Sequence, residues 1–133
     1  MKKERRRKMG ESRNNGKDNS DLTERLLDFA VTVIKLIDML PKTAIGKHIG
    51  GQLIRSGTSP GSNYEEACGA ESRADFIHKL GIALKELKES RFWLKLIKRA
   101  KLVQSECAEP FLQECQELCA ILAKSIITAK GNK

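Results

Sequence analysis

The chain has 133 residues, enough for one domain but too few for a Rossmann enzyme with a separate substrate domain or for a TIM barrel. Hydrophobic residues make up 40% and charged residues 32%, and Leu, Ile, Ala, Lys and Glu dominate, which favours helices over a β-sandwich or β-barrel. The formal net charge of +8 is compatible with a polyanionic partner.

Residues 1–19 form a separate basic segment. They contain eight Lys or Arg and three Asp or Glu, a charge of +5, whereas residues 20–133 carry only +3. Their only hydrophobic residues are Met1 and Met9, so we expect a disordered tail at 1–19 before a single helical domain at 20–133. Such a tail can attract nucleic acid by counterion release or simply keep the chain in solution, and the sequence leaves both interpretations open.

Two helices are predicted over about 21–40 and 43–69. The first ends at Pro41 and repeats apolar residues at steps of three and four: Leu22, Leu26, Phe29, Val33, Leu36 or Ile37, and Leu40. The second is less regular, because Pro60 lacks the N–H that would bond to Ser56. We therefore expect one kinked helix in this region.

The third helix, predicted over about 72–101, has two apolar faces. One is an unbroken heptad seam of Phe76, Leu80, Ala83, Leu87, Ser90, Leu94 and Ile97. At about 100° per residue, Ile82, Phe92 and Leu96 lie nearly opposite this seam, with Trp93 between the two faces. A helix of a monomeric bundle needs one apolar stripe, so these four residues are candidates for a subunit interface. The alternative is an ordinary decorated surface.

The fourth helix is expected to begin at Glu109-Pro110, with proline at its first position, and to end at Gly131. Its apolar repeat includes Phe111, Cys115, Leu118 and Leu122, followed by Ser125 and Ala129. The link over 102–108 is short, which makes the third and fourth helices antiparallel neighbours. Together, the four segments predict an all-α, antiparallel up-down four-helix bundle.

Residues for catalysis or metal binding are sparse. His48 and His78 are not linked by spacing to a serine or cysteine nucleophile, and phosphate-binding glycine motifs are absent. The four cysteines lack paired zinc spacing, so we expect buried, reduced thiols. Glu86 and Glu89 are spaced like ligands but fit intrahelical ion pairs with neighbouring Lys and Arg. We expect no enzyme activity, cofactor or metal, and, with no signal peptide or membrane span, a cytoplasmic location.

One flank of the third helix is basic. Lys88, Arg91, Lys95 and Arg99 recur at steps of three and four, and we call them the basic row. Cations near a helix C-terminus also stabilise the helix dipole, so a solvated face is the alternative. As a functional hypothesis, the row binds RNA or DNA through phosphates rather than bases.

Several segments together resemble a known family. They are Gln52-Leu53-Ile54-Arg55-Ser56-Gly57-Thr58-Ser59, Asn63-Tyr64-Glu65-Glu66-Ala67, Ser72, Asp75-Phe76-Ile77-His78-Lys79, Ile82-Ala83-Leu84-Lys85-Glu86 and Trp93-Leu94. This pattern, over about 21–130, resembles the small bacterial four-helix bundles that include proteins encoded in intervening sequences of 23S ribosomal RNA genes. Pro60 departs from it, since an aliphatic residue is common there.

The resemblance implies a ring-like homopentamer without established enzymatic activity, for which nucleic-acid association is the usual suggestion. A related branch, the accessory variability proteins of diversity-generating retroelements, is similar in fold and is thought to assist a reverse transcriptase with its RNA. A scaffold for a protein partner is therefore the alternative function. Among the motif residues, Arg55, Asn63, Glu66 and Asp75 are expected to pair and cap helices rather than form an active site.

Overall fold

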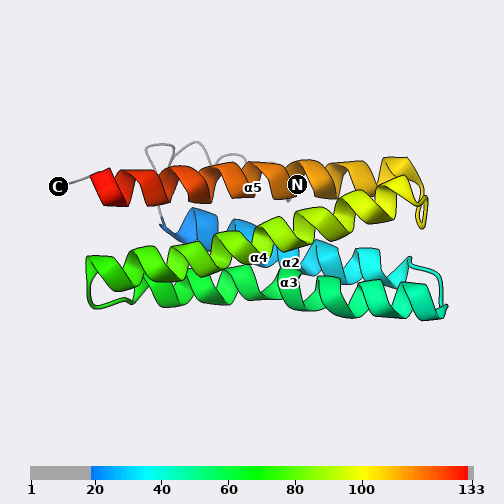
Figure 1. Ribbon diagram of the computed structural model, residues 1–133, viewed down its shortest axis with the longest axis horizontal. Helices are drawn as coiled ribbons and strands as arrows, with labels where there is room; N and C mark the ends of the chain where they lie inside the picture. The colour runs from blue at the N-terminus through cyan, green and yellow to red at the C-terminus, as the bar shows by residue number, and fades with distance from the viewer. Residues whose placement is uncertain (1–18, 132–133) are drawn as a thin grey trace, which may run out of the picture.

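The computed structural model describes residues 19–131 and shows four helices, with no strand among these residues. They are α2 (Asn19–Asp38), α3 (Ala44–Cys68), α4 (Arg73–Arg99) and α5 (Ser105–Gly131). Short connections join them at alternate ends of an elongated bundle (Figure 1). The prediction of an all-α helical bundle is confirmed.

The turn between α2 and α3 is built around Pro41. The residue before a proline avoids helical backbone angles. Helix α2 accordingly ends at Asp38, three residues before Pro41, and Met39 N just beyond its end donates to Leu36 O. Gly46 lies so close to Pro41 that a Cβ there would be 1.9 Å from the proline carbonyl oxygen. The turn therefore requires glycine at the start of α3.

Helix α3 runs unbroken through Pro60, which is fully buried. Its start is capped by Thr43, whose hydroxyl accepts from Gly46 N at 3.1 Å. The prediction of one continuous element over 43–69 is confirmed within one residue at each end. A bend at Pro60 stays a prediction.

Helix α4 has a defined cap at each end. Ser72 accepts from Asp75 N at the start. At the other end Leu102 N donates to Ile97 O, which closes a Schellman-type turn. Lys101 adopts the left-handed conformation in this turn, with φ of 58°, where glycine is usual.

The predicted start of α5 is wrong by several residues. The helix begins at Ser105, with Gln104 O accepting from Cys107 N and Ala108 N, so Pro110 lies inside it. Ala108 is fully buried, which favours extending the helix back to include it. Pro110 has no N–H to donate to the carbonyl oxygen of Glu106. Both residues are exposed, so water can bond to this carbonyl instead.

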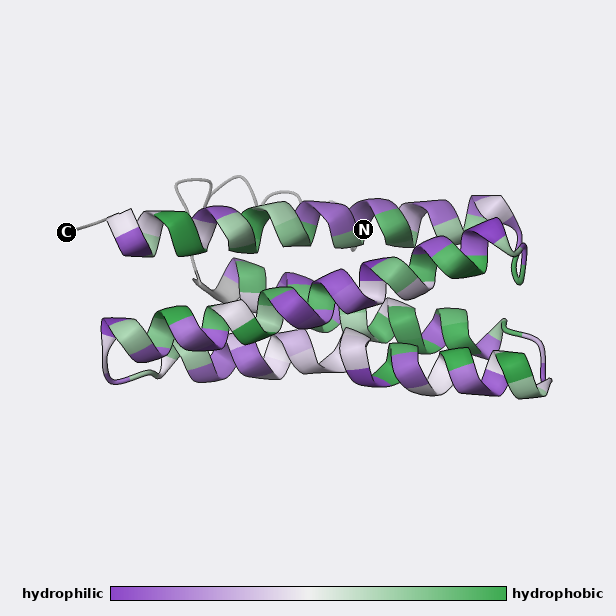
Figure 2. Ribbon diagram, viewed as in Figure 1, coloured by the Kyte–Doolittle hydropathy of each residue, from purple (hydrophilic) through white to green (hydrophobic). Residues whose placement is uncertain are grey.

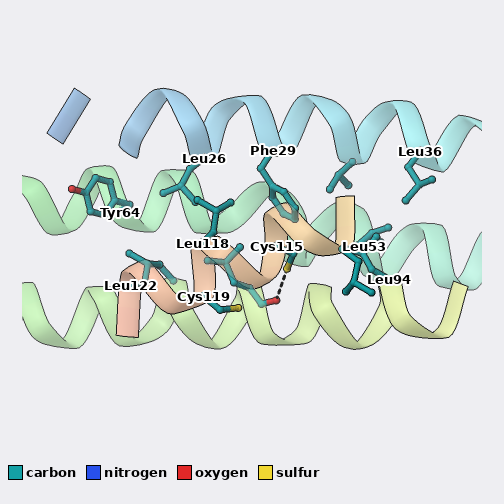
Figure 3. Close-up of a cluster of buried hydrophobic side chains, with 14 of the residues drawn as sticks. Leu26, Phe29, Leu36, Leu53, Tyr64, Leu94, Cys115, Leu118, Cys119 and Leu122 are labelled. Atoms are coloured by element: carbon teal, nitrogen blue, oxygen red, sulfur yellow. Dashed lines mark hydrogen bonds between the residues drawn. The ribbon is translucent and has the colours of Figure 1, made fainter. Parts of the chain in front are cut away.

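The core lies along the axis of the bundle, and the predicted seam residues fill it. Figure 3 shows Leu26 and Phe29 of α2 directed toward Leu118 and Cys115 of α5. The predicted α4 seam is confirmed, since six of its seven residues are buried: Leu80, Ala83, Leu87, Ser90, Leu94 and Ile97. Phe76, the seventh, is half-buried at the end of the bundle.

The helices are not packed equally. The contact between α3 and α4 is the most extensive and includes a fully buried hydrogen bond of 2.9 Å between Ser56 and Ser90. Among the four adjacent pairs, α2 and α5 have the smallest contact, and Arg25 of α2 crosses to Glu114 and Glu117 of α5. Since each helix has two neighbours, α2 and α4 are diagonally opposite.

Residues 1–18 lie outside the described part of the chain, so the disordered tail stays a prediction. Asn19, which we assigned to that tail, is the first residue of α2. Among the described residues, no helix is long and apolar enough to cross a membrane.

Candidate nucleic-acid interface

The basic row lies on one flank of α4 and is largely accessible. Lys88, Lys95 and Arg99 are exposed, and Arg91 is half-buried. At a rise of about 1.5 Å per residue, the row is about 17 Å long. Figure 2 shows hydrophilic and hydrophobic residues alternating along this helix, as expected when its faces differ.

None of the four basic-row side chains forms an ion pair with a carboxylate in the described part of the chain. On the same helix, Lys98 pairs with Glu109 of α5. The row is therefore a set of four neighbouring cations whose charge is free to meet an external anion.

The row borders α5. Lys88 and Arg91 are close enough to Cys119 for their charges to act on its thiol. By helical phase, the other side of the row adjoins Phe92, which together with Ile82, Trp93 and Leu96 forms a surface that we call the α4 face. The cations thus lie between the α4–α5 contact and an exposed apolar surface.

Arg55 forms a charged network between α3 and α4. Its Nη1 lies 2.9 Å from Glu86 Oε1, and its Nη2 bonds to Glu89. The sequence predicted that Glu86 and Glu89 pair with Lys and Arg of their own helix, and this prediction is wrong. Side chains of α3 are adjacent along the whole contact, and a planar guanidinium can reach both carboxylates together.

This network holds Glu89 in its charged form. The hydrogen bond from Arg55 lowers the pKa of Glu89, and that from Trp93 Nε1, at 3.2 Å, lowers it further, while burial opposes both. His48 is exposed and meets the Trp93 ring edge to face, with centroids 6.1 Å apart. An ionised carboxylate bound to a guanidinium is a poor proton donor, so the cluster has a structural character.

The other motif residues make local contacts. Asn63 Nδ2 donates to Ser59 O at 3.0 Å, within α3. Glu66 accepts from Lys79 of α4 at 3.2 Å. Asp75 lies in the first turn of α4, where its backbone N–H is capped by Ser72. The sites are spread along the bundle rather than gathered into one pocket.

The α4 face is partly open. Phe92 is 56% exposed and Leu96 36%, whereas Ile82 and Trp93 are half-buried. Phe92 stacks edge to face on Trp93, with centroids 5.0 Å apart. An apolar surface of this kind is typical of a contact with another molecule.

A second exposed apolar surface was missed by the sequence analysis. Leu27, Val31 and Ile34, which we call the α2 face, lie on the outer side of α2, with Leu27 54% exposed. Their spacing of four and three residues is typical of an apolar helix face. It was not recognised because α2 has apolar residues on most of its sides. Ile34 also borders a groove of about 410 Å³ between α2 and α3, with Ile54, Gly50 and Gly51 on its other side.

The cysteines differ in environment. Cys115 and Cys119 are buried as predicted, and no disulfide joins the cysteines of the described chain. Cys68 is exposed, so the prediction is wrong there, because this residue lies on the outer side of α3, whereas its neighbour Ala67 is buried in the core. The described residues contain no group of three or more His, Cys, Asp or Glu side chains able to hold a metal.

Comparisons with known proteins agree on the family. A model of the 23S rRNA-intervening sequence protein family matches residues 18–124. The fold is similar to a crystal structure of a protein of unknown function from the S23 ribosomal protein family of Bacteroides thetaiotaomicron, with a TM-score of 0.74 and 38% identity over 79% of this chain and 97% of that one. No curated protein matches the chain. By its helices and its sequence, the chain belongs to the 23S rRNA-intervening sequence protein family.

Proposed function

We propose that this protein is a non-enzymatic, oligomeric bundle that binds RNA or DNA through phosphate contacts. The observation that carries the proposal is the basic row of Lys88, Arg91, Lys95 and Arg99, whose four cations have no carboxylate partner among the described residues. Charged groups that find no internal partner are well placed to release counterions from a polyanion.

Phosphates rather than bases are the expected contacts. The row lies within helix α4, and α5 packs against this helix, so among the described residues no loop or ribbon extends from the row into a groove. Contacts to the backbone fix orientation without reading sequence. The protein should therefore bind structured RNA and DNA with little sequence preference.

The test is affinity measured against salt concentration. For four neutralised phosphates, the slope of log affinity against log salt concentration is about −3.6 on duplex DNA and about −2.8 on single strands. Replacing all four basic-row residues by Glu should abolish binding, with circular dichroism showing intact helices.

A matched variant separates the site from overall charge. Lys35, Lys42, Lys47 and Lys124 are exposed and lie elsewhere on the bundle, and their replacement by Glu changes the net charge equally. The proposal predicts that this second variant retains most of the binding. Equal loss in both variants would contradict the assignment to the basic row. Comparing the full chain with residues 19–133 measures the contribution of the basic tail.

For assembly, we propose a ring in which the α4 face of one subunit meets the α2 face of the next. The faces lie on diagonally opposite helices and differ in residues, so a two-fold contact would leave one of them exposed, whereas a head-to-tail ring buries both. Five subunits is the number that the family resemblance implies.

Light scattering on the purified protein tests the ring. Phe92→Asp places a charge in the proposed interface and should lower the mass toward a monomer. Ile127→Asp is the matched control, since Ile127 is 69% exposed near the end of α5 and outside both faces. A monomeric wild type, or a Phe92→Asp variant of unchanged mass, would rule out this ring.

A protein partner is the second candidate function, favoured by the exposed area of the same two faces. It predicts capture of a partner that is insensitive to salt, in a protein that binds no nucleic acid. A cytoplasmic location is part of the proposal, because free thiols persist in a reducing compartment.

A further inference from the structure

Two thiols lie together between α4 and α5. Cys115 and Cys119 are one helical turn apart on α5, the first fully buried and the second 5% exposed. The Cys115 thiol donates to Leu87 O of α4 at 3.3 Å, shown by the dashed line in Figure 3. Both sulfurs are therefore held on the same side of a rigid helix and away from bulk water.

Two cations lie beside the pair. Lys88 and Arg91 of the basic row are close enough for their charges to act on the Cys119 thiol. A negative charge on metal-bound sulfur at this place is therefore compensated by cations of α4.

A disulfide is a poor fit to this geometry. Cβ atoms one turn apart on a helix are about 5–6 Å from each other, whereas a disulfide needs about 3.5–4.5 Å. Two metal–sulfur bonds of about 2.3 Å span about 4.6 Å, which a regular helix can accommodate. A bridging atom thus fits where a direct bond would distort α5.

We propose that Cys115 and Cys119 form a two-coordinate site for a soft, closed-shell cation, with Cu(I) as the ion that fits it best. Thiolates select soft ions, and zinc would need further ligands that the described residues do not supply in a group. Binding forms two Cu–S bonds, breaks the two S–H bonds and releases both protons to solvent. The resulting site has a charge of −1, which Lys88 and Arg91 balance.

The experiment uses Cu(I) itself, under anaerobic conditions, with a chromophoric Cu(I) chelator as competitor. The full chain carrying Cys68→Ser and Cys107→Ser removes the two other thiols and leaves the pair intact. We expect this protein to retain one Cu(I) per chain, with two sulfur neighbours in its X-ray absorption spectrum. Zn(II) should not compete.

Cys119→Ser and Cys115→Ala, each in the same background, should lower Cu(I) affinity by more than the roughly 10–100-fold that loss of an outer-shell partner costs. Circular dichroism and melting of the metal-free variants establish that they fold, and Cys119→Ser is the milder change because Cys119 is less buried. Failure of the parent to bind, or unchanged affinity in folded Cys119→Ser, would overturn the proposal. The cysteine variants leave the basic row intact, so their loss of Cu(I) affinity is distinguished from any loss of nucleic-acid binding.

Discussion

The two helical hairpins of the bundle are held together in different ways. Helices α2 and α3 approach so closely that a Cβ at Gly57 would lie 2.9 Å from Val33 Cγ2, and one at Gly50 would lie 3.3 Å from Ile37 Cγ2. Helices α4 and α5 have no such glycine, since Gly81 and Gly131 have no atom within 4 Å of a built Cβ. Their contact is made by large side chains and by the thiol of Cys115 against Leu87.

Each hairpin is therefore vulnerable to a different kind of substitution. A contact made through missing side chains fails when an atom is added, because closely approaching helices must separate. A contact made through large side chains fails when atoms are removed, because a cavity remains. Enlarging a glycine should therefore destabilise the α2–α3 contact, whereas shortening a large side chain should destabilise the α4–α5 contact.

The largest effect is expected on the α4 side. Leu87→Ala removes a fully buried side chain and should lower the free energy of unfolding by about 2–5 kcal/mol. Denaturant unfolding measures it. Ile127→Ala, at an exposed position of α5, should change stability by less than about 0.5 kcal/mol. Similar losses in both variants would mean that the α4 seam is not the packed core described above.

An intermediate effect is expected on the α2–α3 side. Gly57→Ala places a methyl group against Val33 and should cost about 1–3 kcal/mol in thermal or denaturant unfolding. Gly51→Ala, six residues earlier on the same helix, has open space around the new methyl group and should instead stabilise by about 0.5–1 kcal/mol through helix propensity. The contrast fails if both substitutions change stability in the same direction.

The smallest effect on stability is expected at the turn after α4, where backbone conformation rather than packing is changed. Lys101 has a left-handed backbone conformation, which costs most residues about 1–2 kcal/mol. Lys101→Gly removes this strain but increases the conformational entropy of the unfolded chain, so the net stabilisation should be about 0.5–1 kcal/mol. Ala100→Gly, at a right-handed position, should destabilise by a similar amount. A destabilised Lys101→Gly would show that its side chain matters more than its backbone.

Much of the fold could be predicted from periodicity. The α4 seam is a regular heptad over more than five turns, and its residues are buried as predicted because only one phase of the helix can face both α3 and α5. The start of α5 was predicted too late because proline is strongly favoured at the first position of a helix, and Pro110 was assigned to that position. The helix begins earlier, at Ser105, and Ala108 within this extra turn is buried against other helices.

The candidate site was predicted less completely. Helical spacing was enough to place the basic row on one flank. It was not enough to identify Arg55 as the partner of Glu86 and Glu89, because these residues are 31 and 34 positions away along the chain. Nor did it identify the α2 face, since a mostly apolar helix does not reveal which side will be covered.

Helical segments and the residues able to fill a core could be read from the sequence, because periodicity depends on interactions within a few turns of chain. The pairing of charges, the apolar faces that stay open and the side of α5 that buries its two thiols became known from the packed bundle. Those outcomes depend on which helices become neighbours, and neighbouring surfaces are set by packing of the whole bundle.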